Sequence, residues 1–236
     1  MVVSASPADG RVRKGDRTRQ AIVRRAADIA SVEGLEGLSI GRLAGELEIS
    51  KSGVFAHFGA KEELQIAAVG AAVDVFVHHV VTPALTEPTG LRRLWSLTDG
   101  WVAYSRDRVF PGGCFFFNAA AEFDARPGRV RDAVAGAWRA WRELLLGEAE
   151  AAKASGEALA DVDAAQLVFE LIAFLETANG VSLLHDDTSV YTRAGTAVRT
   201  RLLSAATHPD ALRRHLRSRP AVTPPPAAPT PREDTP

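Results

Sequence analysis

Apolar residues recur at three- and four-residue intervals along most of this chain, which is the spacing of an amphipathic α-helix. Runs that alternate apolar and polar residues, as half-buried strands do, are almost absent. The pattern therefore predicts an all-α fold with about nine helices and no sheet. The expected helices cover approximately residues 16–33, 39–47, 50–58, 61–83, 91–102, 114–123, 130–145, 163–185 and 188–206.

Serines, a glycine and a proline mark the ends of several of these helices. Ser39 and Ser50 precede the second and third helices, where a serine hydroxyl accepts a backbone N–H as an N-cap. Gly34 follows the first helix and Pro83 marks the end of the fourth. Only a few residues, around 47–50, join the two short helices, which is the layout of a helix-turn-helix whose second helix enters the DNA major groove.

The helix expected over 163–185 is apolar on nearly every side. Leu167, Phe169, Ile172 and Leu175 point in different directions around a helical axis. Such a helix must be covered all round, and in a small helical protein a second subunit often supplies the missing cover. The sequence therefore predicts a homodimer that pairs through residues 163–206 as a four-helix bundle.

Composition divides the chain into four parts. Residues 1–16 are charged or small and predict a disordered basic arm. Residues 207–236 contain eight prolines and predict a disordered Pro-rich tail. Between them, 17–64 form the expected helix-turn-helix domain, and 65–206 form a larger helical domain.

The charge of the chain is small but unevenly distributed. The formal net charge is −1, yet residues 1–61 carry ten Lys or Arg against seven Asp or Glu. Seven of the basic residues lie between Arg11 and Arg25. A basic block of this kind either meets phosphate groups or forms a solvated tail.

Other features bear on location and chemistry. Cys114 is the only cysteine, which favours a reducing compartment, and no secretory signal or membrane-length apolar run of ~18 residues is evident. We therefore expect a cytoplasmic protein with no membrane partner. No Gly-rich phosphate loop, Ser-His-Asp arrangement or Cys/His metal spacing is present, and the adjacent rings of His78 and His79 would point about 100° apart on a helix. The sequence predicts no cofactor, no metal and no enzymatic activity, and the alternative from another class is an all-helical enzyme.

Residues 17–64 resemble the DNA-binding domain of the tetracycline-repressor (TetR) family. The matching features, in chain order, are Thr18-Arg19, Ala26-Ala27, Gly34, Leu38-Ser39-Ile40, Leu43-Ala44, Ile49-Ser50-Lys51, Val54-Phe55-Ala56-His57-Phe58 and Lys61-Glu62-Glu63-Leu64. The alternative is a helical hairpin used only for packing. The resemblance implies a regulator that binds double-stranded DNA, with one recognition helix from each subunit of a dimer in half-sites about one turn apart.

The recognition helix departs from the family pattern at three positions. Gly53 stands where the family usually has Thr or Ser, and Phe55-Ala56 where it usually has Tyr-Tyr or Tyr-Trp. Fewer side chains can therefore hydrogen-bond to bases, and we expect phosphate contacts to carry much of the affinity. His57 has an alternative role in capping or packing. The candidate DNA-binding residues are Ser39, Arg42, Lys51, Ser52, Gly53, Phe55, His57 and Lys61.

The resemblance also implies that the larger domain binds an effector and dimerises. Aromatic residues gather in its central helices, and apolar walls with a few polar groups are typical of ligand sites. The candidate ligand-binding residues are Trp95, Trp101, Tyr104, Phe116, Asn118, Glu122, Trp138, Trp141 and Phe174, with Glu176 as a further polar candidate. Each ring could instead belong to the core, and Cys114 could be a redox sensor or a small buried apolar residue.

The family mechanism predicts a repressor that leaves a palindromic operator when a small, mainly apolar molecule binds the larger domain, with the helix that begins at Lys61 transmitting the change. The nearer alternative is a ligand-independent dimeric DNA-binding protein.

Overall fold

The computed structural model describes residues 7–218, with side chains from 15 to 216. Within that range the fold is entirely helical, and strand-like pairing is limited to one isolated bridge between Ala158 and Ala206. The elements are α1 (Pro7–Glu33), α2 (Ile40–Glu46), α3 (Lys51–Phe58), α4 (Lys61–Phe76), a π-helical segment η1 (Val77–Val81), α5 (Thr82–Ala84), α6 (Leu91–Arg106), α7 (Phe115–Phe123), α8 (Arg129–Ala154), α9 (Ala164–Leu184), α10 (Ser189–Ala205) and α11 (Pro209–Ser218).

The all-α prediction is confirmed, but both predicted tails need correction. Helix α1 begins at Pro7, so residues 7–16 are helical and not a disordered arm. Proline suits the first helical turn, where its missing N–H has no intrahelical partner, and Arg, Lys and Ala in the following residues favour helix. The C-terminal tail contains α11, which is held by the buried Leu212. The predictions of disorder over 1–6 and 219–236 lie outside the described residues.

The helix that begins at Lys61 ends at Ala84, within one residue of its expected end, but it is not α-helical throughout. It runs through α4, η1 and α5 without a break, and Pro83 lies inside its last turn. Proline has no N–H for the carbonyl one turn earlier, and the backbone widens into π-helical bonding just before it. Repeat spacing cannot predict such a segment, because one extra residue per turn leaves no clear mark in so short a stretch.

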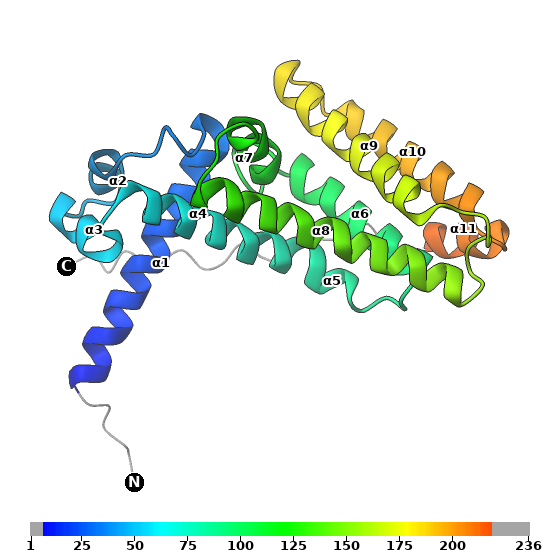
Figure 1. The fold of residues 1–236 in the computed structure, drawn as a ribbon, viewed down its shortest axis with the longest axis horizontal. Coiled ribbons are helices and arrows are strands. Elements are labelled where there is room, and N and C mark those ends of the chain that lie inside the picture. Colours follow the sequence, from blue (N-terminus) through cyan, green and yellow to red (C-terminus); the bar gives the residue numbers. More distant parts are fainter. Residues whose placement is uncertain (1–6, 219–236) are drawn as a thin grey trace, which may run out of the picture.

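The helix-turn-helix domain lies at one end of the molecule, and α4 leads from it into the larger domain (Figure 1). Helix α4 packs against α1 in the first domain and against α8 in the second. Helices α9 and α10 lie side by side along the far part of the bundle, and both contact α6. Helix α7 sits between the domains and contacts α1 and α8.

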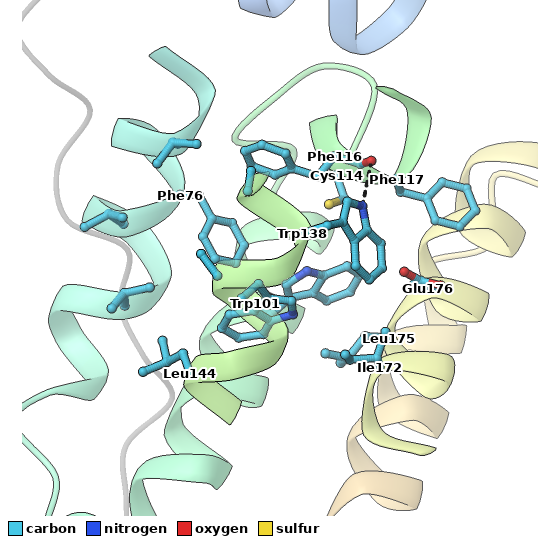
Figure 2. Close-up of a pocket in the computed structure, with 16 residues that line it drawn as sticks. Phe76, Trp101, Cys114, Phe116, Phe117, Trp138, Leu144, Ile172, Leu175 and Glu176 are labelled. Atoms are coloured by element: carbon cyan, nitrogen blue, oxygen red, sulfur yellow. Dashed lines mark hydrogen bonds between the residues drawn. The ribbon is translucent and has the colours of Figure 1, made fainter. Parts of the chain in front are cut away.

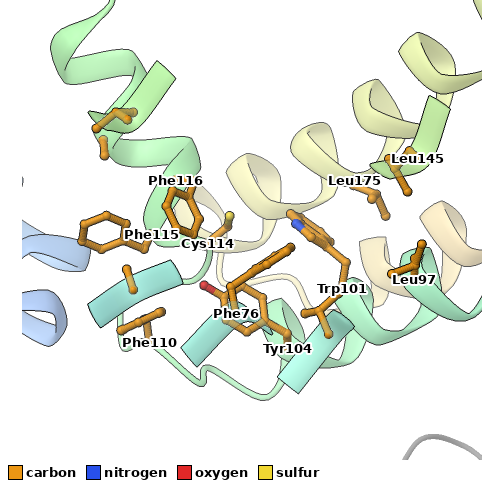
Figure 3. Close-up of a cluster of buried hydrophobic side chains, with 14 of the residues drawn as sticks. Phe76, Leu97, Trp101, Tyr104, Phe110, Cys114, Phe115, Phe116, Leu145 and Leu175 are labelled. Atoms are coloured by element: carbon orange, nitrogen blue, oxygen red, sulfur yellow. The ribbon is translucent and has the colours of Figure 1, made fainter. Parts of the chain in front are cut away.

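An aromatic cluster fills the centre of the larger domain (Figure 3). The Phe76 ring packs edge-on against Tyr104, Phe116 and Trp141, with centroid distances of 5.4, 5.8 and 5.1 Å. Such edge-to-face pairs stabilise by about 0.5–1.5 kcal/mol beyond the area they bury. Phe76 therefore fixes the position of α4 relative to α6, α7 and α8.

Two helices in the described part of the chain are long and apolar enough to cross a membrane by length and composition alone, which corrects the expectation that no such run exists. They are Lys61–Ala84, comprising α4, η1 and α5, and α9. The first packs against α1, α6 and α8, and α9 packs against α6, α8 and α10. Helix packing of this kind requires apolar side chains in a bundle, so the composition of these helices alone is weak evidence for a span.

Candidate DNA-binding surface and ligand cavity

The helix-turn-helix is built by two serine caps, as the sequence predicts. Ser39 Oγ accepts the backbone N–H of Arg42 at 3.1 Å, and Ser50 Oγ accepts that of Gly53 at 3.0 Å. Each cap satisfies a backbone donor at the start of a short helix. Val54 and Phe58 are buried on the inner side of α3, which leaves its other side toward solvent.

The turn between α2 and α3 contains a feature that periodicity did not reveal. Glu48 has a φ of 53°, in the left-handed region that a residue with a Cβ rarely adopts. The chain therefore reverses between the helices at a cost in backbone strain, since Glu48 takes the place that a glycine would fill more easily.

Six of the eight predicted DNA-binding residues lie on α3 or at the start of α2, and the other two already bond to groups within the protein. Lys51, Ser52 and Phe55 are exposed on α3, and the Phe55 side chain is 56% exposed. Gly53 and His57 are half-buried on the same helix, and Ser39 is exposed at the start of α2.

The remaining two, Arg42 and Lys61, are already engaged within the protein. Arg42 pairs with Glu33 and, at 2.9 Å, with Glu46. Lys61 Nζ donates to the Glu36 carbonyl at 2.7 Å and lies 3.1 Å from its carboxylate. Hydrogen bonds from Gln65 and then Lys61 hold the pKa of Glu36 below its usual value. In contrast, Lys51 forms no ion pair in the part of the chain described, so its charge faces solvent.

A cavity of about 200 Å³ lies inside the larger domain (Figure 2). An apolar cavity of roughly 150 Å³ is enough to hold benzene, so this one has room for a ring and a small substituent. Its walls come from α4, η1, α6, α7, α8 and α9, and the lining residues are Val73, Phe76, Val77, Val81, Trp101, Cys114, Phe116, Phe117, Ala137, Trp138, Ala140, Trp141, Leu144, Ile172, Leu175 and Glu176.

The structure sorts the predicted ligand-binding residues. Trp101, Phe116, Trp138 and Trp141 line the cavity, as does Glu176. Trp95, Tyr104 and Phe174 do not line it and pack in or against the core. The sequence prediction missed the lining contributed by α4 and η1, including Phe76 and Val77. Their side chains resemble those of any buried helix, so no signal in the sequence separates them from the core.

Asn118 and Glu122 also lie outside the cavity, at the contact between the two domains. Glu122 accepts the backbone N–H groups of Leu35 at 2.7 Å and Glu36 at 2.9 Å. Asn118 Nδ2 donates to the carbonyls of Ser31 at 2.7 Å and Gly112 at 3.1 Å. These side chains therefore join α7 to the end of α1 and to the turn that leads into α2, and we call this set of bonds the α7 contact.

Glu176 is the only carboxylate among the described residues of the cavity wall. Burial raises its pKa to about 7, because a charged carboxylate loses hydration among apolar groups. Its Oε1 atom is buried and has no hydrogen-bond partner in the described structure. In Figure 2 the carboxylate faces the Trp138 ring, whose Nε1 donates instead to the Phe116 carbonyl at 3.2 Å.

Cys114 is a free, buried thiol in the same wall. Burial raises its pKa to about 11, so the reactive thiolate is scarce near neutral pH. Of its two predicted roles, the environment therefore favours a small apolar wall residue.

Family comparisons match both domains of the chain. The profile described as "Bacterial regulatory proteins, tetR family" matches residues 22–68, and that described as "Tetracyclin repressor-like, C-terminal domain" matches residues 90–198. A search of curated proteins gives no significant match.

Solved structures share the fold over most of its length. A TetR transcriptional regulator from Chloroflexus aurantiacus is 26% identical, with a TM-score of 0.77 over 82% of this chain and 98% of its own. A transcriptional regulator from Saccharomonospora viridis in complex with choline is 17% identical, with a TM-score of 0.67 over 78% and 95% of the two chains. AibR in complex with isovaleryl coenzyme A and operator DNA is 18% identical, with a TM-score of 0.58 over 69% and 85%.

The helix-turn-helix domain, the helical domain behind it and the two family profiles agree with one another along the chain. This protein belongs to the TetR family of DNA-binding transcriptional regulators.

Proposed function

We propose that the protein is a homodimeric repressor that leaves a palindromic operator when a small, mainly apolar molecule occupies the cavity of the larger domain. The observation that carries this proposal is the position of α7. The helix supplies Phe116 and Phe117 to the cavity wall and Asn118 and Glu122 to the contact with the DNA-binding domain. Neighbours of the same fold bind small molecules, and one of them also binds operator DNA.

The solvent-facing side of α3 is the proposed recognition surface. Lys51 and Ser52 lie in its first turn, where a lysine and a hydroxyl reach phosphate oxygens and the helix N-terminus favours an anion. Phe55 and Ala56 are exposed on the same helix and offer only apolar contact, for example to a thymine methyl group. Phosphate contacts therefore supply much of the affinity.

Selection of DNA duplexes from a random pool tests whether the protein binds a palindromic operator. We expect a palindrome whose half-sites are about one helical turn apart, because a two-fold dimer presents two copies of α3. Recovery of unrelated sequences, or no retention of DNA at low salt, would exclude an operator-binding role.

Lys51→Ala is expected to weaken binding to all duplexes by a similar factor. Each subunit would lose one phosphate contact, so the slope of log affinity against log salt should decrease by about 2 for the dimer. Lys61→Ala should have a smaller effect, since Glu36 already holds that ammonium. Lys153→Ala, at the end of α8, removes the same charge far from α3 and is the control. Fluorescence anisotropy at several salt concentrations measures the slopes, and equal slopes for Lys51→Ala and Lys153→Ala would contradict the assignment.

The proposed dimer forms through α9 and α10. Phe169 is 68% exposed and Leu184 is 79% exposed on α9, which are large values for apolar side chains. Association through this face would remove both side chains from water, which stabilises a dimer. Pairing of α9 and α10 with their copies would cover these side chains in a four-helix bundle.

The α7 contact is the proposed route between the cavity and the DNA. A molecule that displaces Phe116 or Phe117 moves the helix that holds the turn before α2 through Glu122. Helix α4 forms a second route, because it begins in the helix-turn-helix domain and supplies Phe76 to the cavity. A ligand shifts the DNA-binding equilibrium only as far as it prefers one arrangement of these helices over the other.

The four tryptophans offer a direct test, because all of them lie outside the DNA-binding domain. Since coupling between sites is reciprocal, binding of the selected duplex should change tryptophan fluorescence in the wild-type protein. In the double variant Asn118→Ala/Glu122→Ala we expect this change to fall by at least half. Glu143→Ala removes an exposed carboxylate on α8 and should leave it intact. No fluorescence change in the wild type would favour a ligand-independent DNA-binding protein.

A further inference from the structure

Starting from the proposed effector site, we infer that the cavity selects an organic cation that carries an aromatic or branched apolar group, such as a quaternary ammonium compound. The inference rests on one buried carboxylate oxygen without a hydrogen-bond partner in the described structure, Glu176 Oε1, and on several aromatic rings that line the same cavity. The proposed function does not specify the charge of the effector, and this inference adds it.

The carboxylate is the first part of the argument. Glu176 Oε1 is buried without a hydrogen-bond donor, although buried carboxylates normally have one. No Lys, Arg or His belongs to the cavity wall described above, so the protein itself offers no counter-ion there. A ligand cation would supply the missing partner, whereas an anion would meet Glu176 with nothing to neutralise it.

The aromatic faces are the second part. Trp101, Trp138 and Trp141 line the cavity together with Phe76, Phe116 and Phe117. Aromatic rings attract cations through their faces, tryptophan most strongly, and cages of such rings bind quaternary ammonium groups. A quaternary ammonium group donates no hydrogen bond, so the scarcity of acceptors in this wall does not penalise it. The remaining lining is aliphatic and suits an apolar substituent.

A matched pair of probes tests the charge requirement on the full-length protein without DNA. Benzyltrimethylammonium and neopentylbenzene have nearly the same shape and differ in one atom, nitrogen or carbon, and therefore in charge. We expect calorimetry or tryptophan quenching to show the cation binding at least about tenfold more tightly at pH 8, an advantage within the range of desolvated cation–π contacts. Equal affinity for the two probes, or preference for neopentylbenzene, would overturn the inference.

Glu176→Gln keeps the shape of the side chain and removes its charge. We expect it to reduce the preference for benzyltrimethylammonium at least about threefold, to the part that the rings contribute, while leaving neopentylbenzene binding unchanged. Glu143→Gln makes the same change on the exposed side of α8 and should retain the preference. Circular dichroism checks that the Glu176→Gln variant folds. If the variant does not fold, the comparison of the two probes in the wild-type protein still tests the inference. An undiminished preference in folded Glu176→Gln would assign the selectivity to another group and overturn the role of Glu176.

Affinity for the cation should also depend on pH. The Glu176 carboxylate attracts the ligand only when it is ionised, while the rings attract it at any pH. With a pKa of about 7 for Glu176, the affinity should therefore be lower at pH 6 than at pH 8, by up to about tenfold. The other titratable group in the wall is the Cys114 thiol, which stays protonated across this range because its pKa is raised to about 11. A flat profile in the wild type would contradict the inference. Because these experiments use no DNA, their failure would leave the proposed operator binding untouched, and failure to bind DNA would leave this result standing.

Discussion

Phe169→Arg on α9 is expected to convert the proposed dimer into monomers at micromolar concentration and to lower operator affinity by at least about 100-fold. Burial of one phenylalanine side chain stabilises by roughly 1.5–3 kcal/mol, and a two-fold interface buries it twice. The loss of about 3 kcal/mol or more corresponds to at least about 100-fold in the dimer dissociation constant. Sedimentation at several protein concentrations and anisotropy with the selected duplex measure the two quantities.

The control for this variant is Leu85→Arg, which places the same charge on another exposed apolar residue. Leu85 follows α5 and is 51% exposed, whereas Phe169 is 68% exposed on α9. We expect Leu85→Arg to remain dimeric and to bind DNA normally. A dimeric Phe169→Arg protein with unchanged operator affinity would show that the subunits pair through another surface.

Gly112→Ala is expected to lower the free energy of unfolding by about 3 kcal/mol, the largest stability effect that we predict. A Cβ at this position would lie 1.8 Å from the Ser31 carbonyl oxygen, so the backbone on one side of the α7 contact must move. Overpacking of this kind costs about 1–3 kcal/mol. The shift would also strain the bonds from Gly112 N–H to Ser31 Oγ and from Asn118 to both carbonyls, each contributing about 1 kcal/mol.

Gly136→Ala provides the matched control, because nothing lies within 4 Å of the added methyl group. Gly136 lies inside α8, where alanine is a better helix former, so its substitution should raise stability by about 0.5–1 kcal/mol. Urea unfolding followed by circular dichroism compares the two variants. If Gly112→Ala were as stable as the wild type, the α7 contact would be looser than its interatomic distances indicate.

The local structure of the chain follows directly from its sequence. Ser39 and Ser50 cap the helices that they were expected to cap, and α9 lies between its N-cap Asp163 and its C-cap His185, the bounds that the apolar pattern predicts. The family also follows from sequence, because the motif around residues 38–64 specifies local geometry and surface chemistry together. Such features depend on neighbours within about four residues, which a single sequence displays.

Only the tertiary structure decided which residues line the cavity. Phe174 and Glu176 differ by two residues on α9, a rotation of about 200°, and Glu176 lies in the cavity wall while Phe174 does not. Asn118 and Glu122 looked like ligand-binding polar groups but bond to the end of α1 and the turn after it, some 87 residues away in sequence. Periodicity identifies which residues are apolar and how they repeat, but only the packing of α4, α6, α7, α8 and α9 determines whether a given side chain meets another helix, the other domain or an enclosed space.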